Sequence, residues 1–112
     1  MNLSARCNII IRNYNKKFDL ETISKIKKIC KKKGLKLFLS NNPKLAIQAN
    51  LDGVYIPSFN KSLNLNNFRN KKKNFIILGS AHNISEIKFK EKQGVNLIFL
   101  SPLFLTKNYQ NN

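Results

Sequence analysis

Polar and basic side chains recur at one kind of place in this chain, directly after each of five short apolar segments. They are Arg12 and Asn13, Ser40 and Asn41, Ser58 and Asn60, Ser80 and His82, and finally Ser101, Thr106 and Lys107. Each is ordinary alone, because serine and asparagine are common loop and cap residues and a single histidine is more often structural than catalytic. Their repetition after every segment is more informative than any one of them.

The acidic residues do not follow this pattern. They are Asp19, Glu21, Asp52, Glu86 and Glu91, and all fall in predicted helices or at the beginning of a strand. We therefore expect no carboxylate at the polar strand ends. A hard cation such as Mg²⁺ is usually held by carboxylates, so this distribution argues against a metal site there.

The apolar segments themselves are predicted to be β-strands. They cover residues 8–12, 35–39, 54–56, 75–78 and 97–100, and most are rich in β-branched residues. Leu97 to Leu100 is continuously apolar, which is typical of a strand buried on both faces.

Helix signals occupy most of the intervals between these strands. The strongest predicts a helix from the N-cap Asp19 to the terminator Gly34, with lysines in its last turn. Its apolar stripe consists of Leu20, Ile23, Ile26 and Ile29. Asn42 and Pro43 predict a short helix through Ala49. Asn83 is expected to cap a helix that ends at Gly94, whereas residues 61–70 form a loop or an irregular helix.

Strands that alternate with helices indicate serial βα units and a parallel sheet. No GxGxxG or GxxxxGK[ST] sequence follows any strand, which disfavours the nucleotide-binding versions of an open sheet. The predicted fold class is therefore α/β: a partial (β/α)8 TIM barrel with about five parallel strands and outer helices. A complete barrel has eight strands in typically ~250 residues, so we expect 1–112 to be a single incomplete barrel domain. In such folds the site forms at the carboxyl ends of the strands, where the polar residues are predicted.

Composition excludes several classes of protein. The chain has 42% hydrophobic and 23% charged residues, which is within the range of globular domains. No apolar run approaches the ~20 residues that span a bilayer, and residues 1–12 lack a signal-peptide core. We expect a cytoplasmic protein without membrane contact. Cys7 and Cys30 lack metal-site spacing and are predicted to be buried free thiols.

The formal net charge of +16 raises the possibility of a polyanionic partner. Lysine supplies nearly all of it, whereas base recognition favours arginine. The abundance of Lys, Asn and Ile also fits an A/T-rich coding sequence. Nucleic-acid binding is therefore disfavoured, and a basic nucleic-acid-binding module remains only as an alternative.

Several stretches resemble the thiamine-monophosphate synthase/TenI family in their order and spacing. They are Leu37–Asn41 with Lys44–Ala46, then Asp52–Ile56, Ile76–His82 and Ser101–Lys107. The last is similar to the family's G-P-V-F-P-T loop and is the most specific. The resemblance implies a TIM barrel of which this chain supplies the second through sixth strands. It also implies a transferase of thiamine biosynthesis, which joins a pyrimidine diphosphate to a thiazole phosphate, releases pyrophosphate and uses Mg²⁺.

The resemblance further implies which residues contact phosphate. Arg12 matches the pyrophosphate-binding arginine of Q-x-R-x-K, although Ile10 and Tyr14 replace its glutamine and lysine. The phosphate-contact candidates are Arg12, Ser40, Asn41, Asn60, Ser80, Thr106 and Lys107. Asn41 and Asn60 stand where the family has its metal-binding carboxylates, so Mg²⁺ is expected for the family but not well supported by this chain.

The leading prediction is thus a thiamine-phosphate-synthase-like protein that is impaired or inactive as this chain alone. The alternative is a non-catalytic phosphate- or thiazole-binding remnant, or half of a split protein. Small-molecule phosphate substrates are the expected ligands. Because an incomplete barrel exposes its outer strands, self-association or a complementary barrel fragment is a further expected partner.

Overall fold

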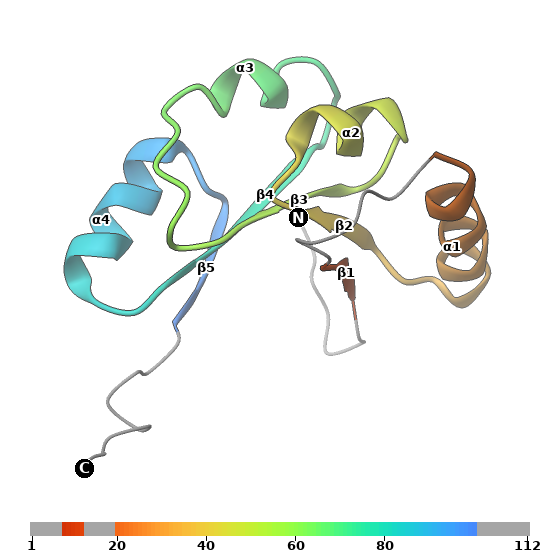
Figure 1. Ribbon diagram of the computed structural model, residues 1–112, viewed down its shortest axis with the longest axis horizontal. Helices are drawn as coiled ribbons and strands as arrows, with labels where there is room; N and C mark the ends of the chain where they lie inside the picture. The colour runs from red at the N-terminus through yellow and green to blue at the C-terminus, as the bar shows by residue number, and fades with distance from the viewer. Residues whose placement is uncertain (1–7, 13–19, 101–112) are drawn as a thin grey trace, which may run out of the picture.

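The computed structural model describes residues 8–12 and 20–100 of the chain (Figure 1). Its strands are β1 (Ile9–Ile11), β2 (Leu37–Ser40), β3 (Gly53–Ile56), β4 (Ile76–Ala81) and β5 (Leu97–Leu100). Its helices are α1 (Leu20–Lys33), α2 (Pro43–Gln48), α3 (Asn66–Arg69) and α4 (Ile84–Gln93). The alternation of strands and helices confirms the predicted βα repeat.

All five strands lie parallel in one sheet, in the order β1-β2-β3-β4-β5. Each strand therefore pairs with the next one along the chain. A doubly wound sheet would reverse its strand order at a switch point, and the described strands contain no such reversal. The sheet also curves beneath its helices (Figure 1). This is the arrangement of successive strands in a barrel, as the sequence predicted.

The predicted caps form at most helix ends. The side chains of Asn42 and Asn83 accept hydrogen bonds from the backbone N–H groups of Leu45 and Glu86, at 3.1 and 2.8 Å. Gly94 follows α4 with a φ of 85°, the left-handed conformation that glycine adopts without strain. Asp19 lies outside the described residues.

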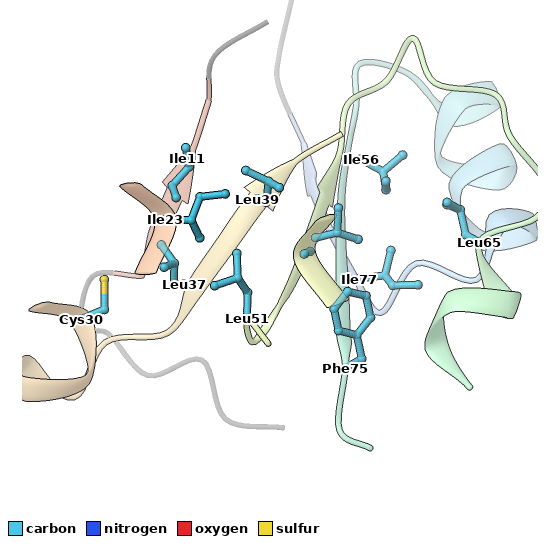
Figure 2. Packing of buried hydrophobic residues seen from close by; sticks show 12 residues of the cluster. Ile11, Ile23, Cys30, Leu37, Leu39, Leu51, Ile56, Leu65, Phe75 and Ile77 are labelled. Atoms are coloured by element: carbon cyan, nitrogen blue, oxygen red, sulfur yellow. The ribbon is translucent and has the colours of Figure 1, made fainter. Parts of the chain in front are cut away.

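The main hydrophobic core lies between the helices and the face of the sheet that they cover. Figure 1 shows the helices on that one face. Figure 2 shows Ile23 of α1 beside Ile11 and Leu37, while Ile77 of β4 belongs to the same cluster. A second cluster, formed by Phe38, Ile76 and Leu78 with Ile10, Tyr55 and Leu97 around it, alternates with the first along the strands. Because successive residues of a strand point to opposite faces, this second cluster lies on the face away from the helices.

The apolar stripe of α1 differs in part from the prediction. Ile23 is buried and Ile26 is half-buried, but Leu20 and Ile29 are 44% and 57% exposed. A step of three residues falls short of one helical turn, so a series of such steps drifts off the buried face. Cys30 takes the inward position instead, and it is the buried free thiol that was predicted. Cys7 lies outside the described residues.

The prediction that β5 is buried on both faces was wrong. Phe99 and Leu100 are 44% and 65% exposed. Within the described part of the chain β5 pairs only with β4, so its other edge has no neighbouring strand to cover its side chains. None of the helices in this part of the chain has the length and apolarity needed to cross a membrane.

Candidate functional site

Most of the predicted polar residues in the described part of the chain lie at one edge of the sheet. The parallel pairing brings the carboxyl ends of the strands together, with Ile11 opposite Leu39, Ile56 opposite Gly79, and Ala81 opposite Leu100. Arg12 follows β1, Ser40 is the last residue of β2, and Asn41 comes directly after it. Asn60 follows β3, and Ser80 is the next-to-last residue of β4. Thr106 and Lys107 lie outside the described residues.

Arg12, Ser40 and Ser80 belong to the sheet face that points away from the helices. Along their strands they alternate in step with Ile10, Phe38 and Leu78, the residues of the second cluster. The guanidinium carbon of Arg12 lies 5.8 Å from the centroid of the Tyr55 ring. This cation–π contact holds an exposed arginine over the carboxyl end of β3.

A hydrogen bond between two amide side chains joins the ends of β2 and β3. Nδ2 of Asn60 donates to Oδ1 of Asn41 at 2.7 Å. The backbone of Asn41 is itself fixed, because its N–H donates to the carbonyl of Tyr55 at 2.6 Å and its φ is 60°, a value that asparagine tolerates. We call this pair the Asn41–Asn60 bridge.

Hydrogen bonds from two side chains of α4 hold the segment that carries Asn60. The carbonyl of Asn60 accepts hydrogen bonds from Nζ of Lys90 at 2.8 Å and from Nε2 of Gln93 at 2.9 Å. Nε2 of Gln93 also donates to the carbonyl of Ser62 at 2.8 Å, and Oδ1 of Asn60 accepts from the N–H of Ser62 at 2.8 Å. Sequence reasoning missed both Lys90 and Gln93, because a lysine and a glutamine in a helix are normally read as solvent-exposed.

Lys90 is buried almost completely, with 1% of its surface exposed. Burial and the nearby charge of Lys61 lower its pKa to about 8, against the opposing influence of Glu86. The ammonium group nevertheless remains protonated in most molecules at neutral pH. The side chain therefore places a positive charge behind the polar edge.

The prediction that no carboxylate lies at this edge was wrong. Oε1 of Glu86 accepts a hydrogen bond from the backbone N–H of His82 at 2.6 Å, and it lies 3.1 Å from His82 Nδ1. The backbone hydrogen bond is the main reason that the pKa of Glu86 is lowered. Glu86 was missed because α4 begins almost directly after β4, so its first turn lies at the carboxyl end of the sheet. Its carboxylate thus links the first turn of α4 to the backbone of His82.

The residues at this edge do not fit a Mg²⁺ ion. The described residues contain no group of three or more His, Cys, Asp or Glu side chains that could hold a metal. At the two positions of the expected carboxylates, the amide oxygens of Asn41 and Asn60 already accept hydrogen bonds, from Asn60 Nδ2 and from the N–H of Ser62. They are also neutral, whereas Mg²⁺ is usually bound through carboxylates and phosphates.

Comparison with known proteins gives a consistent result. Residues 7–112 match the family model described as thiamine monophosphate synthase. A relative from Aquifex aeolicus (strain VF5), named "Putative thiamine-phosphate synthase 2", is 31% identical over 86 residues, which are 75% of this chain and 44% of the relative. The structure of thiamine phosphate pyrophosphorylase from Pyrococcus furiosus superimposes with a TM-score of 0.60 at 17% identity, covering 85% of this chain and 46% of that protein. The chain thus spans less than half of each of these two proteins.

Proposed function

The chain belongs to the thiamine monophosphate synthase family, and we propose that it works in thiamine biosynthesis as a cytoplasmic protein that binds a phosphate-bearing precursor. Its five strands correspond to the second through sixth strands of the family's barrel. The ligand is bound at the carboxyl edge by Arg12, the Asn41–Asn60 bridge, Ser40 and Ser80.

The convergence of donors at this edge is the observation that supports the proposal. The guanidinium of Arg12 offers a planar pair of N–H donors, which suits two oxygens of one phosphate group. Its stacking on Tyr55 limits the directions it can take. The Asn41–Asn60 bridge joins two neighbouring strand ends, so a ligand at this edge meets a fixed surface.

We do not expect this chain alone to catalyse the synthase reaction. The two carboxylate positions are neutral amides, which compensate the charge of a metal ion less than carboxylates do, so they are poorly suited to hold the metal that the diphosphate requires. With both substrates and Mg²⁺, the isolated chain should form no thiamine phosphate above the rate without protein. Turnover that disappears in an Arg12→Ala variant would contradict this.

Binding is tested directly with inorganic pyrophosphate, titrated calorimetrically into the full chain. Replacing Arg12 by alanine should weaken binding about 10- to 100-fold, since a charge-assisted hydrogen bond contributes roughly 1.5–3 kcal/mol. The matched control is Lys28→Ala, which removes one positive charge from the exposed surface of α1. Equal weakening in both variants would mean that pyrophosphate responds only to net charge, and the proposed site would be wrong.

The same pyrophosphate titration is repeated in the presence of Mg²⁺. Because neither amide is placed as a ligand, the affinity for pyrophosphate should be nearly the same with and without Mg²⁺, once binding of the ion by free pyrophosphate is subtracted. A large gain in affinity with Mg²⁺ that is lost in Asn60→Ala would show that Asn60 holds the ion.

We also infer that the chain associates with a second copy or with a complementary barrel fragment. Phe99 and Leu100 are exposed on β5, whose outer edge has no partner strand among the described residues. Paired edges would satisfy backbone groups and cover these side chains. Added salt screens the charge of +16 and should promote association in sedimentation experiments. A folded monomer at low and high salt would overturn this inference.

A further inference from the structure

We propose that Lys90 and Gln93 are positioning residues: together they fix the segment after β3, and through it the Asn41–Asn60 bridge, at the carboxyl edge of the sheet. The functional meaning of this role rests on the proposed function of that edge. The role itself rests on the packing and hydrogen bonds of two buried polar side chains.

Lys90 reaches the segment through a space that a glycine provides. A Cβ atom on Gly79 would lie 3.1 Å from Cδ of Lys90 and 3.0 Å from Cγ1 of Val95, which is tighter than ordinary packing. The lysine stem thus runs across β4 where that strand has no side chain. At its end, Nζ bonds to the carbonyl of Asn60 and to Oε1 of Gln93, at 2.8 and 2.5 Å.

Gln93 completes the attachment. It has no exposed surface, its oxygen accepts from Lys90, and its Nε2 donates to two carbonyls of the segment, those of Asn60 and Ser62. The N–H of Ser62 in turn donates to the side chain of Asn60, whose Nδ2 donates to Asn41. The hydrogen bonds therefore form one connected chain from α4 to the end of β2.

A purely structural role would not require these residue types. Burying an ammonium group is unfavourable, and an apolar side chain of similar volume often stabilises a protein equally well. The hydrogen-bond acceptors of Lys90 are neutral oxygens on its own helix and on the segment, so it gains no direct ion pair. What the pair does provide is directional attachment of a stretch that has no helix or strand of its own between β3 and α3.

The test compares Lys90→Met and Gln93→Met with the control Lys92→Met, which removes an exposed charge from the same helix. Two quantities are measured by NMR in the full chain without ligand: the exchange rate of the Ser62 amide and the chemical shifts of the Asn60 side-chain amide. Both substitutions of buried residues should speed Ser62 exchange by about tenfold, the effect of losing one net hydrogen bond. They should also move the Asn60 resonances, while Lys92→Met leaves both quantities unchanged.

Denaturant unfolding and pyrophosphate titration separate the remaining outcomes. If Lys90→Met or Gln93→Met unfolds at the same denaturant concentration as the wild type and its Ser62 amide exchanges at the wild-type rate, the proposal is wrong. If both variants unfold, the conservative Gln93→Glu, which keeps the volume but loses Nε2, is measured instead, and unchanged exchange there also overturns the proposal. Faster exchange together with weaker pyrophosphate binding supports it. Faster exchange with unaltered pyrophosphate binding supports the positioning role but contradicts the proposed function of the edge.

Discussion

Helices α1 and α4 cover the same face of the sheet, yet they bury different kinds of side chain. The buried residues of α1 are Ile23 and Cys30, whereas those of α4 are Lys90 and Gln93. In α4 the apolar Ile84 is 70% exposed. The first helix is thus attached by apolar burial, which stabilises without specifying direction. The second is attached through hydrogen bonds to a segment of the candidate site, so the helix with the weaker apolar pattern is the one that organises the site.

The largest effect that distinguishes the two helices is expected from Ile23→Ala in α1. Ile23 is fully buried in the main core, so its truncation leaves a cavity and should lower the free energy of unfolding by about 2–5 kcal/mol. Ile84→Ala is the control in α4, where the exposed side chain should contribute less than about 0.5 kcal/mol. Urea denaturation measures both. If Ile23→Ala and Ile84→Ala lowered the free energy of unfolding by similar amounts, the two helices would not differ in how they are attached.

A smaller effect is expected at the glycines that end the two helices. Gly94 after α4 has a φ of 85°, and a Cβ there would lie 2.4 Å from Oδ1 of Asn66. Gly94→Ala should therefore destabilise by about 1–3 kcal/mol. Gly34 after α1 has a φ of 69° and is exposed, so Gly34→Ala should lose only the conformational part, about 1–2 kcal/mol. Thermal unfolding that ranks Gly34→Ala as the more damaging change would show that the α4 terminus is not tightly packed.

The smallest effect concerns pH. The pKa of Lys90 is about 8 in the folded chain, below its ordinary value of 10.5, so between these values the unfolded chain binds more protons. The penalty of burying the charge is complete below pH 8 and is relieved as the pH rises. The stability of the wild type relative to Lys90→Met should therefore increase between pH 8 and 9, by no more than about 1.4 kcal/mol.

The exposed lysines of α1 provide the control for this titration. Lys28→Met removes the same charge from the exposed surface, and the pH dependence measured for it is subtracted as the contribution of net charge. A flat difference for Lys90→Met would indicate that the ammonium is hydrated in solution and titrates normally.

Most of the fold was predictable because its signals are local. Asn42, Asn83 and Gly94 mark helix ends through bonds or dihedral angles within a few residues of themselves, and the structure confirms all three. The exposure of Leu100 has no such local signal, and only the expected incompleteness of the barrel pointed to an uncovered outer strand. It depends on whether another strand pairs with β5, which no pattern within Leu97 to Leu100 can reveal.

The candidate site was predictable only in part. Arg12, Asn41 and Asn60 lie at the predicted edge because strand direction alone determines which end of a parallel sheet they reach. Lys90 could not be found this way, since its burial depends on Gly79 in another element and on Asn60, 30 residues earlier in the chain. Hydropathy assigns a lysine to solvent unless such tertiary partners are known.

The order of the strands has a consequence for how the chain is made. Paired residues of neighbouring strands are separated by only 15 to 28 positions, because each strand pairs with the one synthesised before it. Short separations reduce the entropy lost when each contact closes, and they favour rapid folding. During translation, each new βα unit can dock on the edge that the previous unit has just completed. The order in which residues leave the ribosome is therefore also the order in which the strands can pair.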